Sequence, residues 1–135
     1  MKRLLLLACC APLFSACDTG MIAPSVQEIT LAPNERAQAG GLVLTFTRVV
    51  SDTRCPMGAL CRPGYVSNAV IELALSRGAT APDAVVDVSL ETTPTEARYA
   101  GYSVALTQLA PVRQPGSDIP PGDYRATVRI TRTLP

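Results

Sequence analysis

The sequence predicts an all-β protein, either an antiparallel β-sandwich of immunoglobulin-like type or a partly open barrel, with about six to eight strands. Two observations lead to this prediction. Polar and apolar residues alternate with a period of two in most segments after residue 25, as they do in half-buried strands. Pro, Gly, Asn and Asp gather between these segments, where turns are expected. No segment has convincing helical spacing, so we expect residues 26–135 to form one sandwich domain.

Three strands are expected in the first half of this domain. Residues 26–32 run into the turn-prone sequence Ala-Pro-Asn-Glu-Arg, which begins at Ala32. Residues 41–50 alternate large apolar side chains with Val and Thr, and residues 67–76 place apolar side chains on one face and Asn68 and Glu72 on the other. The expected inward-facing side chains are Leu42, Leu44, Phe46, Ala69, Ile71, Leu73 and Leu75.

Three more strands are expected in the second half. Residues 84–91 set Val86, Val88 and Leu90 against Asp87 and Ser89, whereas residues 102–109 alternate less regularly. Residues 123–131 alternate most clearly, with Tyr124, Ala126, Val128 and Ile130 set against two Arg and two Thr residues. The predicted core consists of Leu44, Phe46, Ile71, Leu73, Val86, Val88, Val128 and Ile130.

Residues 1–16 have the organisation of a secretory signal peptide. Lys2 and Arg3 precede an apolar run from Leu4 to Phe14, which small residues follow. This run is shorter than the roughly 20 residues that a membrane-spanning helix needs. We therefore expect the mature chain to lie outside the cytoplasm.

Cys17 indicates how the chain is held there. The sequence Leu13-Phe14-Ser15-Ala16-Cys17 resembles the lipobox of bacterial lipoproteins, with Phe14 at a position where Leu is usual. The resemblance implies cleavage before Cys17, a diacylglycerol on that cysteine, and a short tether over residues 17–25. The protein would then be anchored to a membrane of the cell envelope. Secretion without a lipid, after cleavage at another small residue, is the alternative.

The charge of the remaining chain argues against nucleic acid as a partner. From Cys17 onward there are ten Arg, eleven acidic residues, no Lys and no His. A nucleic-acid-binding domain usually has a strongly basic face, which such a balance does not predict. We expect a monomer without a cofactor.

Cys55 and Cys61 are the only cysteines after Cys17, and they most simply form a disulfide. A zinc site needs about four ligands, and this chain supplies no imidazole. A redox pair usually has Cys-x-x-Cys spacing beside a βαβ pattern, and neither is present. In an oxidising compartment a structural disulfide is expected, worth roughly 2.4 kcal/mol for a seven-residue loop.

The residues around these cysteines resemble a family of small bacterial envelope proteins. The matching sequence is Asp52-Thr53-Arg54-Cys55-Pro56, followed by Cys61 and Gly64, and the family pattern is roughly Asp-Ser-Arg-Cys-Pro, then a Cys and a Gly. The resemblance extends over most of residues 42–130. Thr53 stands in place of Ser, Arg62-Pro63 in place of an aliphatic residue and Trp, and Gly64 lies one position early. The resemblance implies the fold and the compartment but no activity.

Asp52 and Arg54 have two interpretations. Arg54 could present its planar donors to a carboxylate or phosphate in a recognition loop that also contains Met57, Leu60 and Arg62. Alternatively, Asp52 caps the turn and Arg54 pairs with it or with a carboxylate of the sheet, which is the interpretation we favour. Met57 and Leu60 exposed at the tip of the loop would favour an inhibitor, and a packed tip would favour a purely structural loop.

Catalysis is not expected from this composition. There is no His to act as a base, no Lys after Cys17, and no Gly-rich phosphate loop. A glycosidase would need two carboxylates on either side of a cleft for the sugar. The pairs Glu91 and Glu96, or Asp83 and Asp87, are better explained as polar residues of loops. A stripe with Arg125 and Arg129 fits a solvated sheet face better than a site for anionic lipid or glycan.

Two function classes remain. The first is a lipid-anchored binding or adaptor module that displays loops to an envelope protein or glycan. The alternative is an inhibitor of an envelope or host hydrolase, a protease or a lysozyme, that acts through the disulfide-closed loop 54–62. The sequence does not identify the partner.

Overall fold

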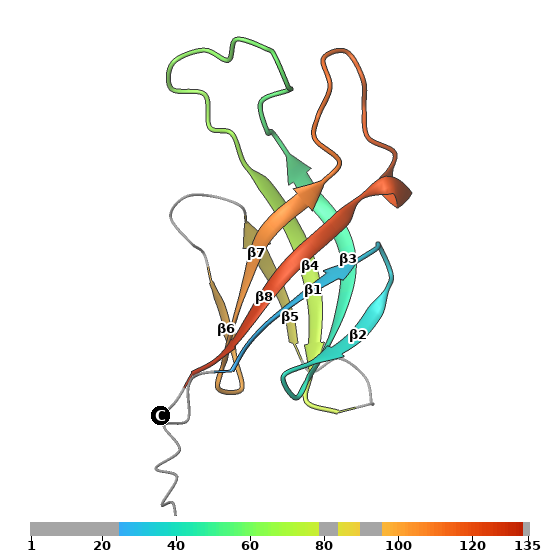
Figure 1. Ribbon diagram of the computed structural model, residues 1–135, viewed down its shortest axis with the longest axis vertical. Coiled ribbons are helices and arrows are strands. Elements are labelled where there is room, and N and C mark those ends of the chain that lie inside the picture. Colours follow the sequence, from blue (N-terminus) through green and yellow to red (C-terminus); the bar gives the residue numbers. More distant parts are fainter. Residues whose placement is uncertain (1–24, 79–83, 90–95, 134–135) are drawn as a thin grey trace, which may run out of the picture.

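The computed structural model describes residues 25–78, 84–89 and 96–133, which form two antiparallel four-stranded sheets (Figure 1). The first sheet has the order β1-β8-β7-β6 and the second β2-β3-β4-β5. The strands are β1 (Val26–Leu31), β2 (Arg36–Ala39), β3 (Leu42–Asp52), β4 (Ala69–Ser76), β5 (Ala84–Ser89), β6 (Ala97–Tyr99), β7 (Tyr102–Ala110) and β8 (Arg125–Arg132). The predicted all-β antiparallel sandwich is confirmed, and the sheets of the described residues do not close into a barrel.

Two short strands were not predicted from the sequence. β2 has four residues and β6 has three, and each begins a hairpin with a two-residue turn. The turns are Gly40-Gly41 and Ala100-Gly101, and all four residues have positive φ. Positive φ at both central residues is what a type I′ hairpin requires, and Gly supplies it without strain. The Gly-Gly pair was therefore a hairpin signal in the sequence.

The core lies between the two sheets and contains the predicted residues. Of the eight predicted core side chains, seven are buried and Val86 is half-buried against them. The core has further members, all in strands except Tyr124, which directly precedes β8: Leu31, Ala39, Leu42, Ala69, Leu75, Val104, Leu106, Leu109, Tyr124 and Ala126. Leu90, which was also expected to face inward, lies outside the described residues.

β7 alternates irregularly because it contains a β-bulge. Its register with β8 shifts between Leu106 and Gln108, so that Thr107 is an extra residue on the β7 side. Leu106 and Leu109, which are three positions apart, are therefore both buried. A bulge moves the following side chains to the opposite face, and this explains why residues 102–109 lack a simple period of two.

β3 contains two register shifts, and they decide where its C-terminal end points. The shifts lie between Phe46 and Arg48 and between Val49 and Ser51. Phe46, Val49 and Asp52 consequently pair with Leu73, Ile71 and Ala69 of β4, which are all buried core residues. Since cross-strand partners share a face, Asp52 faces the interior of the sandwich.

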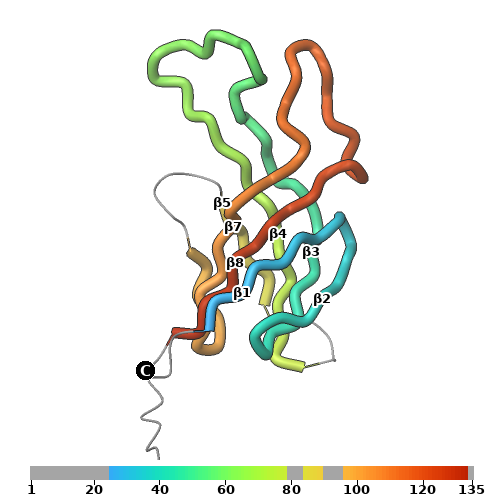
Figure 2. The backbone as a smooth tube through the Cα atoms, in the orientation of Figure 1, coloured from blue at the N-terminus to red at the C-terminus, as the bar shows by residue number. Residues whose placement is uncertain are grey.

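The longest described loops project from one end of the sandwich. Residues 53–68 connect β3 to β4, and residues 111–120 follow β7 (Figures 1 and 2). The start of β1 lies at the opposite end, where Arg132 N–H donates to the carbonyl of Ser25 at 3.3 Å. We call residues 53–68 and 111–120 the loop end. Among the described residues no helix is long and apolar enough to cross a membrane.

Candidate functional site

Asp52 and Arg54 form a bidentate ion pair at the base of the loop end. Arg54 Nε donates to Asp52 Oδ1 at 2.8 Å, and Arg54 Nη2 donates to Oδ2 at 2.6 Å. The Arg54 main-chain N–H also donates to Oδ1 at 3.2 Å, which closes a turn around the carboxylate. The Asp52 side chain is only 7% exposed and the Arg54 side chain only 16%. This pair is therefore largely shielded from water.

Arg54 also links the two sheets. Its Nη1 donates to the carbonyl of Leu109, and its Nη2 donates to the carbonyl of Pro111 at 3.0 Å. With the two bonds to Asp52, four of the five guanidinium N–H donors are used. These are the contacts expected for the structural interpretation of Arg54. They leave little capacity for a carboxylate or phosphate ligand.

Tyr124 completes this buried network, and sequence reasoning placed it only in the core. Its hydroxyl donates to Asp52 Oδ2 at 3.2 Å. Burial opposes ionisation of Asp52, but hydrogen bonds from Arg54 and its positive charge outweigh this effect and hold the pKa of Asp52 below its ordinary value. Burial and the neighbouring Asp52 charge raise the pKa of Tyr124. A buried Tyr hydroxyl needs a polar partner, which was the available sequence signal.

Hydrogen bonds order the two loops above this network. Thr53 Oγ1 donates to the carbonyl of Val66 at 3.1 Å, and Ser67 Oγ accepts from the Cys55 N–H at 3.0 Å. Between the loops, Arg113 Nη1 donates to the carbonyl of Arg54 at 2.8 Å. In the other direction, the Met57 N–H donates a hydrogen bond to the carbonyl of Arg113 at 2.9 Å. Arg113 was not singled out in the sequence, because its partners are main-chain atoms of a distant loop.

Cys55 and Cys61 form the predicted disulfide. Their Cα atoms are 6.2 Å apart, within the usual range for bonded cysteines. No group of three or more metal-ligating side chains occurs within residues 25–78, 84–89 and 96–133. Cys17, the expected lipidation site, lies outside these residues.

The tip of the disulfide loop exposes apolar side chains. Leu60 is 103% exposed and Met57 is 59% exposed. The tip is therefore not packed onto the sandwich, and this is the arrangement that was expected of an inhibitor rather than of a purely structural loop. Arg62 is exposed beside them. Tyr65, Val66 and Val112 are also exposed, so five of the eight large apolar side chains that are exposed in the described part of the chain belong to the loop end.

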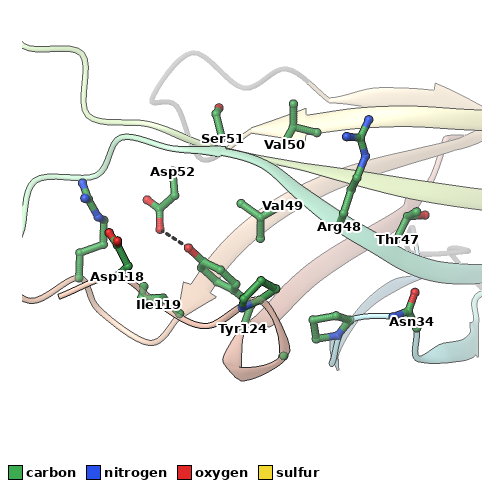
Figure 3. Close-up of a pocket in the computed structure, with 14 residues that line it drawn as sticks. Asn34, Thr47, Arg48, Val49, Val50, Ser51, Asp52, Asp118, Ile119 and Tyr124 are labelled. Atoms are coloured by element: carbon green, nitrogen blue, oxygen red, sulfur yellow. Dashed lines mark hydrogen bonds between the residues drawn. The ribbon is translucent and has the colours of Figure 1, made fainter.

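A cleft of about 690 Å³ opens beside β3, below the loop end (Figure 3). One wall is the C-terminal half of β3, residues 47–52, and the other walls are the turn at Pro33 and Asn34 and the segment that leads into β8. That segment contributes Arg113, Asp118, Ile119, Pro121, Gly122 and Tyr124. Val49 and Tyr124 face each other across the cleft in Figure 3.

Arg125 and Arg129, which the sequence placed on one face of the last strand, both have partners within the protein. Arg129 Nε lies 3.1 Å from Glu28 Oε1, and Arg125 Nη1 donates to the carbonyls of Gly122 and Tyr124.

The carboxylate pairs that were interpreted as polar loop residues are only partly described. Glu96 Oε2 accepts from Ser103 Oγ at 2.6 Å, and Asp87 is exposed on β5, whereas Asp83 and Glu91 lie outside the described residues.

No protein-family model, curated protein or solved structure matches this chain. The class that its described residues define is therefore structural, a two-sheet antiparallel sandwich with a disulfide-closed loop at one end. The resemblance to a family of small envelope proteins stays a prediction.

Proposed function

We propose that this protein is a non-enzymatic, lipid-anchored binding or adaptor module of the bacterial cell envelope, and that the loop end contacts a partner protein. The observation that carries the proposal is the fully exposed Leu60 in a loop closed by the Cys55–Cys61 disulfide. An exposed apolar side chain of this size gains free energy when a partner covers it. Clustered apolar exposure is typical of interaction sites.

The order of the loop supports binding rather than passive exposure. The disulfide, the bond between Met57 N–H and Arg113 and the network below Arg54 restrain the loop before a partner arrives. A restrained loop loses less conformational entropy on binding, so more of the contact energy appears as affinity. Loops on a rigid scaffold are where binding residues commonly lie.

The position of the loop end suits a protein tethered at Cys17. The first described residue, Ser25, lies at the opposite end of the sandwich from the disulfide loop. The eight residue steps from Cys17 to Ser25 reach at most about 30 Å when fully extended. A lipid at Cys17 would then hold the sandwich near the membrane and direct the loop end away from it.

Inhibition of a hydrolase is the second candidate function, and the convex apolar tip favours it specifically. Met57 and Leu60 project from a seven-residue loop that includes the two bonded cysteines, a shape that fits the substrate cleft of a protease or lysozyme. The inhibitor would act by occupying that cleft without chemistry of its own.

Affinity capture from envelope extracts with matched variants tests the proposal. The double variant Met57→Ser/Leu60→Ser should lose the captured partner, because it removes the apolar tip. Val85→Ser is the control, since Val85 is 62% exposed but lies on β5, outside the loop end. Equal capture by wild type and the double variant would contradict a protein partner held by this tip. Inhibition of lysozyme or a serine protease that the double variant abolishes would select the second candidate.

A further inference from the structure

The second sheet has an open edge along the last part of β3. β2 pairs with β3 only from Leu42 to Thr45, although β3 continues to Asp52. The last main-chain bonds on this side join Asn34 N–H to the Phe46 carbonyl at 2.6 Å and Phe46 N–H to the Glu35 carbonyl at 3.1 Å. Beyond Phe46, no strand among the described residues lies on this side of β3.

The register identifies which main-chain groups point to this edge. β4 is regular from Ala69 to Leu73, so the main-chain N–H and C=O groups of its inward-facing residues Ala69, Ile71 and Leu73 all point to the same side of the strand. Phe46, opposite Leu73, directs its N–H and C=O away from β4. Val49 and Asp52 lie opposite the equivalent β4 residues, so their N–H and C=O groups also point away from β4, into the cleft. Within the described part of the chain no other main-chain partner reaches them.

The cleft has the form of a slot along this edge. All six residues from Thr47 to Asp52 line it, which corresponds to a strand of roughly 20 Å. The facing wall combines apolar side chains, Pro33, Ile119, Pro121 and Tyr124, with the polar Asn34, Arg113 and Asp118. Ile119 and Tyr124 lie opposite β3 in Figure 3. The open edge of β3 therefore lies inside a slot, opposite this wall, and is not displayed on a flat surface.

The charges around the slot are largely neutralised by the protein. Arg48 Nη2 lies 3.0 Å from Glu72, which raises the pKa of Arg48, and Asp52 is paired with Arg54. Arg113 and Asp118 remain, with opposite signs. An uncharged segment complements this surface better than a strongly acidic or basic one.

We propose that the slot binds an extended, uncharged peptide segment of a partner protein as an added strand beside β3. The segment would exchange main-chain hydrogen bonds with Val49 and Asp52 and place small apolar side chains, at every second position, against Ile119 and Tyr124. Addition of a strand to an exposed edge is a common mode of peptide recognition. A second copy of this chain is a poorer occupant, because its own open β3 edge lies inside an identical slot and cannot reach the edge of the first copy. This site is separate from the apolar tip at Met57 and Leu60.

A library of random twelve-residue peptides displayed on phage provides the probe. Peptides selected against the protein should be uncharged, with alternating apolar residues, and should protect the Val49 and Asp52 amides from hydrogen exchange. Single N-methylation along a selected peptide should weaken binding at least tenfold at every second position only, because only one edge of the added strand faces β3.

Gly122→Trp tests the location of the site. Gly122 lines the slot, and an added Cβ there meets no heavy atom within 4 Å, so a Trp side chain at this position should narrow the slot without a clash at its Cβ. It should abolish peptide binding, whereas Gln108→Trp, on the exposed outer face of β7, should leave it unchanged. Failure to select any peptide, protection confined to residues 57–66, or N-methyl effects without a period of two would overturn the proposal. So would a dimer that Gly122→Trp dissociates, which would make a second copy the occupant.

Discussion

Replacing Arg54 by Met removes the cation that neutralises a shielded carboxylate and joins the two sheets. Asp52 would keep the Tyr124 hydroxyl and the main-chain N–H of residue 54, but it would lose both bonds from the guanidinium. The carbonyl of Leu109, a buried residue of β7, would lose its bond to Nη1. Met has a similar reach, so the change removes charge and hydrogen bonding more than volume.

The structure sets the size of the expected effect. Breaking a buried ion pair by removing one partner costs about 3–5 kcal/mol, and the 16% exposure of Arg54 places this pair near the lower end. A lost bond to the Leu109 carbonyl adds about 1 kcal/mol. We therefore expect the free energy of unfolding to fall by about 3–4 kcal/mol. For a domain of this size the melting temperature should drop by about 10–15 °C.

Urea unfolding followed by circular dichroism measures this change, and Arg48→Met is the matched control. Arg48 pairs with Glu72, but its side chain is 64% exposed and solvent screens the pair, so its replacement should destabilise the protein much less than Arg54→Met does. The double variant Asp52→Asn/Arg54→Met should recover part of the loss, because no buried charge is left unpaired. Equal destabilisation by the two Arg→Met variants would refute a structural role for the Asp52–Arg54 pair.

Three further predictions concern acid, the disulfide and the anchor. Folding lowers the pKa of Asp52, so the contribution of its carboxylate to stability is complete above the unfolded pKa of about 4 and is lost as pH falls through the folded pKa. The free energy of unfolding of the wild type should therefore decline more steeply below pH ~4 than that of Asp52→Asn. Cys55→Ser/Cys61→Ser should cost about 2 kcal/mol and lower the melting temperature by about 5–10 °C, measured by calorimetry, and two free thiols in alkylated native protein would contradict the disulfide. Intact mass of membrane-extracted protein should show loss of residues 1–16 and a diacylglycerol on Cys17, and an unmodified soluble chain would refute the anchor.

Much of the architecture was predictable from local sequence pattern. In residues 41–46, 67–76 and 123–131 the period of two identified the buried face, because one side of each strand packs on the core and the other meets water. The Cys55–Cys61 pairing was predictable too, since the chain offers no other partners after Cys17. These inferences need only neighbouring residues or an inventory of residue types.

The candidate site depended on tertiary structure. The two register shifts in β3 turn Asp52 inward toward Tyr124, and they are defined only relative to β4, so the alternation within residues 41–50 could not reveal them. The carbonyls of Leu109 and Pro111 that bind Arg54 come from the end of β7 and the loop that follows it, more than 50 positions away.

The cleft likewise exists because β2 ends before β3 does. By itself the sequence determined which faces are buried and which cysteines are joined, because hydrophobic alternation and residue inventory are properties of the chain. Pairing register, and therefore every contact at the loop end and along the open edge, was decided only when distant strands came together.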